Sequence, residues 1–282
     1  MENYYIIPKT TIDDIEESIQ RKRGSDAPIE PSEMPLAIDT IPSSVDGTDV
    51  PVGGIYLTKP DSNGNPTEAH IIGYAPVVNY TWTNMIGSTY FPYLKKIEFI
   101  NTNNITRITD NAFQNCSSLT TINLPDSLTG IGDRTFQNCS SLTTINLPDS
   151  LTGIGGNAFQ SCSSLTTINL PDSLTGIGGG AFYSCSSLTT INLPDSLTGI
   201  GDWAFSGCSS LENVTIENGF NCNNLNLSSS TRYSVETMVS WFNALADRTG
   251  QVSFTLKIGS TNLNKLTAEQ KAIVTNKNWT LA

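Results

Sequence analysis

The sequence predicts an α/β solenoid, built of 23-residue coils that stack through short parallel strands, and three observations carry this prediction. Five cysteines recur every 23 residues, at Cys116, Cys139, Cys162, Cys185 and Cys208. The segment CSSLTTINLPDSLTGIG occurs four times in the same register. A coil of this length cannot bury its own apolar side chains, so these must pack against the same positions one coil away. A small helical module before the coils and an α/β cap after them complete the predicted architecture.

The pattern inside one copy indicates which side chains face the core. Thr121 and Asn123 alternate with apolar residues and are expected to face solvent, as in a short strand that Pro125 ends. The segment after Gly132 predicts a single helical or 3₁₀ turn, which returns a phenylalanine to the core. The residues of this copy that we expect to be inward are Leu119, Ile122, Leu124, Leu128, Ile131 and Phe136.

The full repeat, F-x-x-C-x-S-L-x-x-I-x-L-P-x-S-L-x-x-I-G, resembles the leucine-rich repeats of the BspA type, which occur in bacterial surface proteins and in some viral and protist proteins. The resemblance covers residues 94–216 and implies a leucine-rich repeat solenoid over residues 93–227. An atypical first coil is expected, because an end coil meets solvent on one face. Its apolar positions are Leu94, Ile97, Phe99, Ile105, Ile108 and Phe113.

The N-terminal segment predicts two short helices between residues 10 and 42. Ile12, Ile15 and Ile19 follow a helical spacing, and Gly24 ends the first helix. The pattern I-x-x-I-x-x-x-I-x-x-K-x-G followed by I-x-P-S-x-M-x-x-x-I resembles the module that opens many phage and prophage tail, baseplate and fibre-associated proteins. The resemblance implies that residues 1–42 attach the protein to other virion proteins.

The segments that flank the repeats are expected to cap them. Residues 43–92, rich in Gly, Pro, Asn and Thr, predict a linker and an N-terminal cap. Residues 228–282 predict an α/β cap and resemble the one that often follows BspA-type repeats. In this cap a helix is expected to begin at Ser234 and end at Gly250, and a strand to follow from Val252. Thr267 and Gln270 form the pattern of a capping box for a last helix.

Composition excludes several classes of partner. The net charge of -11 and the lack of a long basic run argue against nucleic acid. No apolar run approaches the roughly 20 residues of a membrane span, so membrane insertion is not expected. The first residues, MENYYIIPKTTIDDIEE, lack the basic and then apolar order of a signal peptide, so we expect no export route of the chain's own.

The residue types argue against an enzyme. His70 is the single histidine and has no partner motif, so we expect no catalytic residue, cofactor or metal. The cysteine column is interpreted as buried free thiols instead of disulfides or metal ligands, and Cys222, which lies off the period, is expected to be partly exposed. Asp126 and its equivalents in later copies favour solvated turns over a calcium site.

The four copies differ from one another almost only after the Ile-Gly corner. One variable column holds Arg134, Asn157, Gly180 and Trp203, and another holds Gln137, Gln160, Tyr183 and Ser206. Drift on a solvent-facing convex edge would explain these differences, and so would a contact surface. Under the second hypothesis the candidate binding residues are Arg134, Asn157, Tyr183 and Trp203.

We therefore expect a non-enzymatic structural protein of a phage or prophage virion, associated with the tail, baseplate or fibre. Its repeats would bind a host cell-surface protein or glycan, and a homo-oligomer is compatible with this arrangement. One alternative is a BspA-like adhesin at the bacterial cell surface, and another is a phage head-decoration protein.

Overall fold

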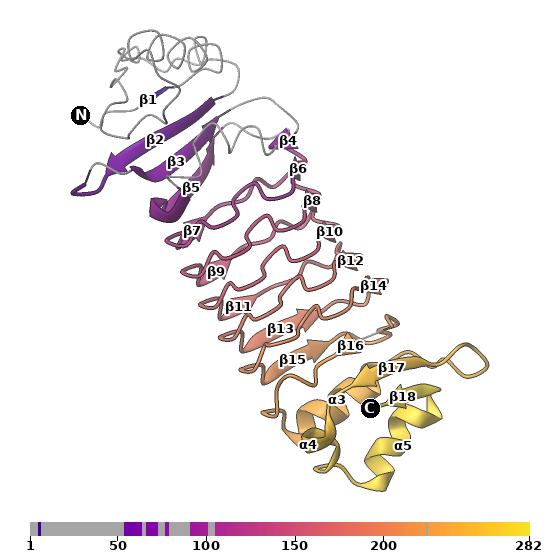
Figure 1. Cartoon of the computed structure of the whole chain (residues 1–282). Helices are drawn as coiled ribbons and strands as arrows, with labels where there is room; N and C mark the ends of the chain where they lie inside the picture. The colour runs from indigo at the N-terminus through magenta and orange to yellow at the C-terminus, as the bar shows by residue number, and fades with distance from the viewer. Residues whose placement is uncertain are drawn as a thin grey trace, which may run out of the picture.

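The described part of the chain forms a row of stacked coils between a β-hairpin and a helical cap (Figure 1). The computed structural model describes residues 5–6, 54–63, 66–72, 77–78, 91–100, 105–223 and 225–282. The two helices predicted between residues 10 and 42 lie outside the described residues, so their prediction stays untested.

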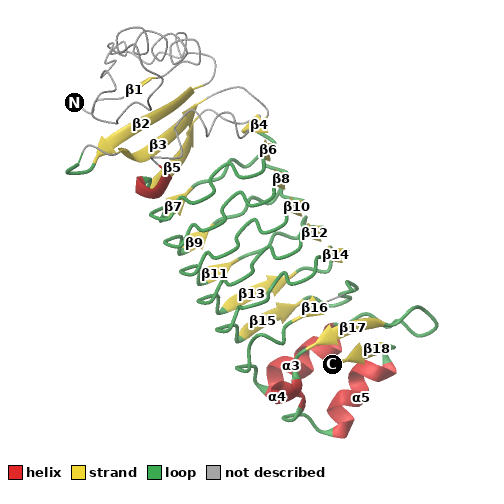
Figure 2. Cartoon of the chain, in the orientation of Figure 1, coloured by secondary structure: helices red, strands yellow, loops and turns green. Residues whose placement is uncertain are grey.

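One side of the solenoid is a run of strands that starts in the hairpin (Figure 2). Its first sheet has the order β1-β2-β3-β5-β7, antiparallel between β1, β2 and β3 and parallel after that. A bridge between Asn123 and Asn146 leads to a second, parallel sheet of order β9-β11-β13-β15. The strands are β1 (Tyr5–Ile6), β2 (Gly54–Pro60), β3 (Pro66–Ile72), β5 (Lys96–Ile100), β7 (Thr121–Ile122), β9 (Thr144–Ile145), β11 (Thr167–Ile168), β13 (Thr190–Leu193) and β15 (Asn213–Ile216).

A second side carries a parallel sheet of two-residue strands, ordered β4-β6-β8-β10-β12-β14. Ile131 pairs with Ile154, so the register advances by one repeat per strand, as the spacing of the copies predicts. The strands are β4 (Val77–Val78), β6 (Arg107–Ile108), β8 (Gly130–Ile131), β10 (Gly153–Ile154), β12 (Gly176–Ile177) and β14 (Gly199–Ile200), and a 3₁₀ helix, η2 (Phe91–Tyr93), precedes the first coil.

The third side consists of tight turns where a helical or 3₁₀ turn was predicted. Gln137 N–H does donate to the carbonyl of Arg134, as in a 3₁₀ turn. Arg134 and Asn138, however, have left-handed φ angles of 53° and 63°, which no helix continues. With this backbone, alternate N–H groups reach the next coil. The N–H of Arg134 donates to the carbonyl of Gly156, and the N–H of Phe136 donates to the carbonyl of Ala158. A third cross-coil ladder therefore replaces the helical turn.

The core is made of columns in which each side chain packs on its own copy. Phe113, Phe136, Phe159, Phe182 and Phe205 stack with ring centroids 5.3–5.6 Å apart. Most of the predicted inward residues are buried, those of the first coil included. Leu124 and Phe99 are only partly buried and pack against the core from its margin.

The cysteine column is a row of buried free thiols, as predicted. The Cys162 thiol donates to the Phe136 carbonyl at 3.2 Å, and Cys208 makes the same bond to Phe182 at 3.1 Å. Burial raises the pKa of the Cys208 thiol to about 12, and that of Cys222 to about 11. The expectation that Cys222 is partly exposed is wrong, because its side chain is buried beside the backbone of Ile200, at the β14 end of the sheet of two-residue strands.

Two glycine columns of the second side have different structural roles. A Cβ added to Gly178 would lie 2.4 Å from the backbone nitrogen of Gly156, and a Cβ on Gly155 2.5 Å from the carbonyl carbon of Gly132. A Cβ added to Gly176 would meet nothing within 4 Å. The corner glycine is therefore required for the close approach of successive coils, whereas the strand glycine is not.

A cap of helices and strands closes the C-terminal end. The predicted N-cap at Ser234 and the capping box of Thr267 and Gln270 are both confirmed. The Trp241 indole donates to the Val214 carbonyl at 2.7 Å, which ties the cap to the last coil. The elements of the cap are α3 (Val235–Ala244), α4 (Ser260–Leu263), α5 (Ala268–Asn276), β16 (Leu225–Asn226), β17 (Phe254–Lys257) and β18 (Trp279–Leu281), with the strands in the order β16-β17-β18.

Two predicted boundaries in the cap are wrong. The helix α3 ends at Ala244, not at Gly250, because Leu245 and Ala246 leave the helix to pair with the backbone of Phe220. The strand β17 begins at Phe254, so Val252 remains in a loop and is 79% exposed.

The two glycine columns give a matched pair of substitutions. Gly178→Ala should lower the free energy of unfolding by about 2–3 kcal/mol, because its methyl group overlaps backbone that cannot retreat without separating the coils. Gly176→Ala, two residues earlier in the same coil, should change it by at most about 0.5 kcal/mol or raise it slightly. Urea denaturation of both variants measures the difference, and equal losses would contradict the close-packed corner.

The buried thiols predict a loss of stability at alkaline pH. An unfolded thiol ionises near pH 8.5 and the folded Cys208 near 12, so its contribution is complete below pH 8.5 and declines as the pH rises toward 12. The decline is about 1.4 kcal/mol per pH unit for one thiol. Cys208→Ala removes this thiol, so its stability should fall less steeply with pH than that of the parent. Urea titrations at several pH values measure the free energy of unfolding of both proteins. If it falls equally steeply between pH 9 and 11 in the variant and in the parent, the raised pKa of Cys208 is contradicted.

Candidate binding surface

The variable column predicted from the sequence lies on the turn side of the solenoid. Its members occupy the same place in successive coils: Arg134, Asn157, Gly180 and Trp203. The backbone pairing shows this, because the N–H of Asn157 donates to the carbonyl of Gly179 at 2.9 Å, and the N–H of Gly180 donates to the carbonyl of Asp202 at 2.9 Å. All four have left-handed φ angles, between 53° and 66°.

Trp203 is the one aromatic residue of this column, and its surroundings do not explain it. The left-handed region suits glycine and asparagine and costs other residues roughly 1–2 kcal/mol. Asn111, Asn157 and Gly180 follow that preference, whereas Arg134 and Trp203 depart from it with φ angles of 53° and 66°. Its side chain is also 67% exposed. Neither backbone preference nor burial in the core therefore accounts for a tryptophan at this position.

The neighbouring column is a ladder of amides that ends in an aromatic residue. The Nε2 of Gln114 donates to the Oε1 of Gln137, whose own Nε2 donates to Gln160. In the next coil the position is taken by Tyr183, a half-buried residue. Within the described part of the chain the side-chain nitrogen of Gln160 has no hydrogen-bond partner, so the ladder presents a free donor where it stops.

The structure gathers three of the four predicted binding residues around Gly180. A Cβ on Gly180 would lie 2.4 Å from the Oδ1 of Asn157 and 3.7 Å from the Cβ of Tyr183. Trp203 follows in the next coil, directly after Asp202. Arg134 belongs to the coil before Asn157, so it lies two coils from Gly180 and outside this group. We call Asn157, Gln160, Tyr183, Asp202 and Trp203 the ladder-end surface.

The charge of this surface comes from exposed carboxylates. The carboxylate of Asp133 already has a partner within the protein, because its Oδ1 accepts a hydrogen bond from the N–H of Gly156. The carboxylate of Asp202 is exposed and accepts no hydrogen bond from the described residues. It is therefore available as an acceptor beside Trp203.

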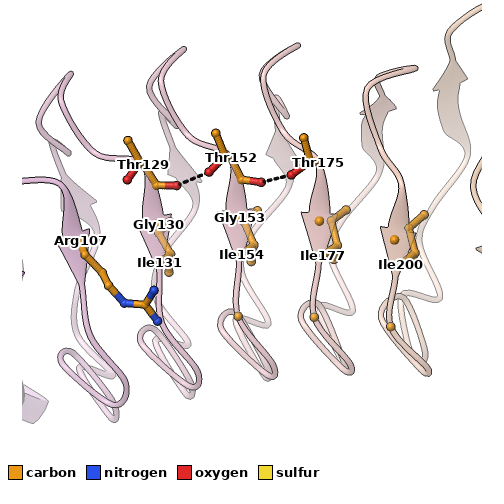
Figure 3. Close-up of a pocket in the computed structure, with 15 residues that line it drawn as sticks. Arg107, Thr129, Gly130, Ile131, Thr152, Gly153, Ile154, Thr175, Ile177 and Ile200 are labelled. Carbon is orange, nitrogen blue, oxygen red and sulfur yellow. Dashed lines mark hydrogen bonds between the residues drawn. The ribbon is translucent and has the colours of Figure 1, made fainter.

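The sequence analysis missed a shallow groove of about 770 Å³ along the second side (Figure 3). Its floor is the strand glycine column of β8, β10, β12 and β14, and the side chain of Arg107 lies at one end (Figure 3). The hydroxyl of Thr152 donates to the carbonyl of Thr129, and Thr175 to Thr152, each at 3.0 Å. No carboxylate, imidazole or thiol lines this groove. The recurring Thr-Gly-Ile-Gly in the copies was the signal that could have revealed it.

The other polar columns behave as solvated surface. Asp126 and its equivalents Asp149, Asp172 and Asp195 are exposed in their turns. Across the residues that the structure describes, no three His, Cys, Asp or Glu side chains lie close enough together to hold a metal ion. None of the described helices has the length and apolar character needed to cross a bilayer.

Comparison with known proteins identifies the repeats. The model of the BspA type leucine-rich repeat region matches six copies, in segments 84–212 and 130–238. No curated protein matches the chain significantly. A leucine-rich repeat protein of T. pallidum superposes with a TM-score of 0.51 at 25% identity, covering 65% of this chain and 90% of its own.

Two further solved structures match the chain with lower TM-scores. A leucine-rich repeat protein from Bacteroides ovatus has a TM-score of 0.40 at 23% identity, covering 76% of this chain and 60% of its own. A leucine-rich cell surface protein from Faecalibacterium prausnitzii has a TM-score of 0.37 at 24% identity, covering 60% of this chain and 55% of its own. Because the family model spans residues 84–238, more than half of the 282 residues, the chain belongs to the BspA-type leucine-rich repeat family.

Proposed function

We propose that this protein is a non-enzymatic, adhesion-type scaffold of a bacterial surface that binds a host cell-surface molecule through the ladder-end surface. The family supports the scaffold role, since BspA-type repeats are typical of bacterial surface proteins. The observation that carries the choice of surface is Trp203, which is exposed and held in a left-handed conformation. Exposed tryptophans of this kind are enriched among the residues that dominate binding energy.

The surface fits a contact role in its position as well. Every coil buries its leucine, isoleucine, phenylalanine and cysteine in the shared core, so these positions cannot vary without disturbing both neighbours. The variable positions of the turn side have no such constraint, because the side chains of Arg134 and Trp203 are exposed and that of Asn157 is half-buried. Variation confined to this side can therefore change what the scaffold binds without changing its fold.

The virion role has less support. Its main argument, the resemblance between residues 12 and 38, concerns residues outside the described part of the chain. The matches reported above concern the repeats and lend no support to a tail or a head location. The surface adhesin therefore replaces the virion protein as the first choice.

The chain supplies its own substitutions for a test of the surface. Trp203→Asn installs the residue that Asn157 provides two coils earlier in the same column, and Tyr183→Gln installs the residue that Gln160 provides one coil earlier. Both residues suit their backbone, so the double variant should unfold at the same temperature as the parent or a few degrees higher. Binding of the full chain to host cells and to matrix proteins should fall at least tenfold.

A control variant separates a contact from a general loss of structure. Thr167→Ser/Asn169→Ser changes two exposed residues on the strand side and should bind like the parent. If the double variant at Trp203 and Tyr183 folds and binds host cells undiminished, the ladder-end surface is not the contact. Antibody labelling of intact producing cells tests the location, and label confined to released phage particles would overturn the surface adhesin.

A further inference from the structure

We propose that the ligand of the ladder-end surface is an uncharged sugar unit of a glycan, stacked on Trp203 and held by the polar groups of Asn157, Gln160 and Asp202. This inference rests on the proposed function and names the chemical class of the ligand. It requires an accessible aromatic face, hydrogen-bond donors and acceptors at its edge, and a local charge that admits neutral ligands.

Trp203 supplies the aromatic face. A pyranose ring presents a flat patch of C–H groups that packs against an indole of similar size, and 67% of this side chain is exposed. The position one coil earlier is Gly180, which has no side chain to compete for the space beside the indole. A side chain there would also collide with the Asn157 amide, 2.4 Å from its Cβ.

The edge of this face carries both hydrogen-bond donors and hydrogen-bond acceptors. Sugar hydroxyls donate and accept, so a matching site needs both. The free side-chain nitrogen of Gln160 is a donor, fixed because the Oε1 of the same amide is held by Gln137. The exposed carboxylate of Asp202 and the Oδ1 of Asn157 above Gly180 are acceptors. Because the cross-coil ladders fix the backbone that carries these groups, binding needs little ordering of the main chain.

The same surface is a poor match for a protein partner or an acidic glycan. Stable protein interfaces bury about 1,200–2,000 Å² around an apolar centre. Here the apolar part is one indole and a half-buried tyrosine, next to Ser206 and Gly207. The Asp202 carboxylate and a net charge of -11 repel carboxylated or sulfated sugars. Arg134, the cation of the variable column, lies two coils from Gly180.

The first experiment measures binding of the full chain to neutral, sialylated and sulfated oligosaccharides, by saturation-transfer NMR and on a glycan array. The inference expects binding to neutral glycans, with transfer strongest to the C–H face of one sugar unit. Trp203→Asn should weaken this binding at least tenfold. Gln160→Glu keeps the acceptor that Gln137 uses but removes the free donor, so it should also weaken binding. Thr167→Ser/Asn169→Ser should have no effect.

A second experiment separates this inference from the proposed function. Host cells are treated either with glycosidases or with protease before the full chain and its variants are added. Binding that depends on Trp203 and is lost after glycosidase treatment supports both conclusions. Binding that depends on Trp203 but survives glycosidase and is lost after protease overturns the sugar ligand and leaves the adhesin standing. Preference for sialylated or sulfated glycans overturns the uncharged ligand, and binding unaffected by Trp203→Asn overturns the surface itself.

Discussion

The structure depends on backbone hydrogen bonding between coils in a register of one repeat. Three ladders, one on each side of the coil, connect each coil to the equivalent segments of the next coil. Side chains are therefore stacked on identical neighbours, which only some types tolerate. Phenylalanine rings stack, as Phe159 does on Phe182, and amides bond in series, as Gln114 does to Gln137. Carboxylates would repel one another, so they occupy exposed turns such as that of Asp126.

Such a stack is open at both ends, and the two ends are closed by different means. At the N-terminal end the hairpin of β2 and β3 extends the strand side, with antiparallel pairing in place of parallel pairing. At the C-terminal end α3 lies against β15, and the Trp241 indole bonds to the backbone of that strand. Both caps use backbone groups that an end coil would otherwise leave unpaired.

The columns also explain how a repetitive fold acquires a specific site. A ladder of identical side chains satisfies itself and offers a ligand the same surface at every coil. Where the ladder is interrupted, the last member keeps a free group, as Gln160 does before Tyr183. Trp203 and Asp202 follow in the next coil, so the interruption joins a free amide, an aromatic face and a carboxylate. The site exists because the copies stop being identical there.

The sequence by itself determined the period, the core columns, the atypical first coil and the helix caps at Ser234 and Thr267. These features are periodic or local, so they can be predicted without knowing which coil lies beside which. The tertiary structure decided the rest, because the deciding contacts come from elsewhere in the chain. Pairing with the next coil gives Arg134 its left-handed turn, Phe220 ends α3 early, and Cys222 is buried beside Ile200 at the end of the solenoid. The gathering of Asn157, Tyr183 and Trp203 around Gly180 likewise follows only from the stacking of three coils, which no single copy encodes.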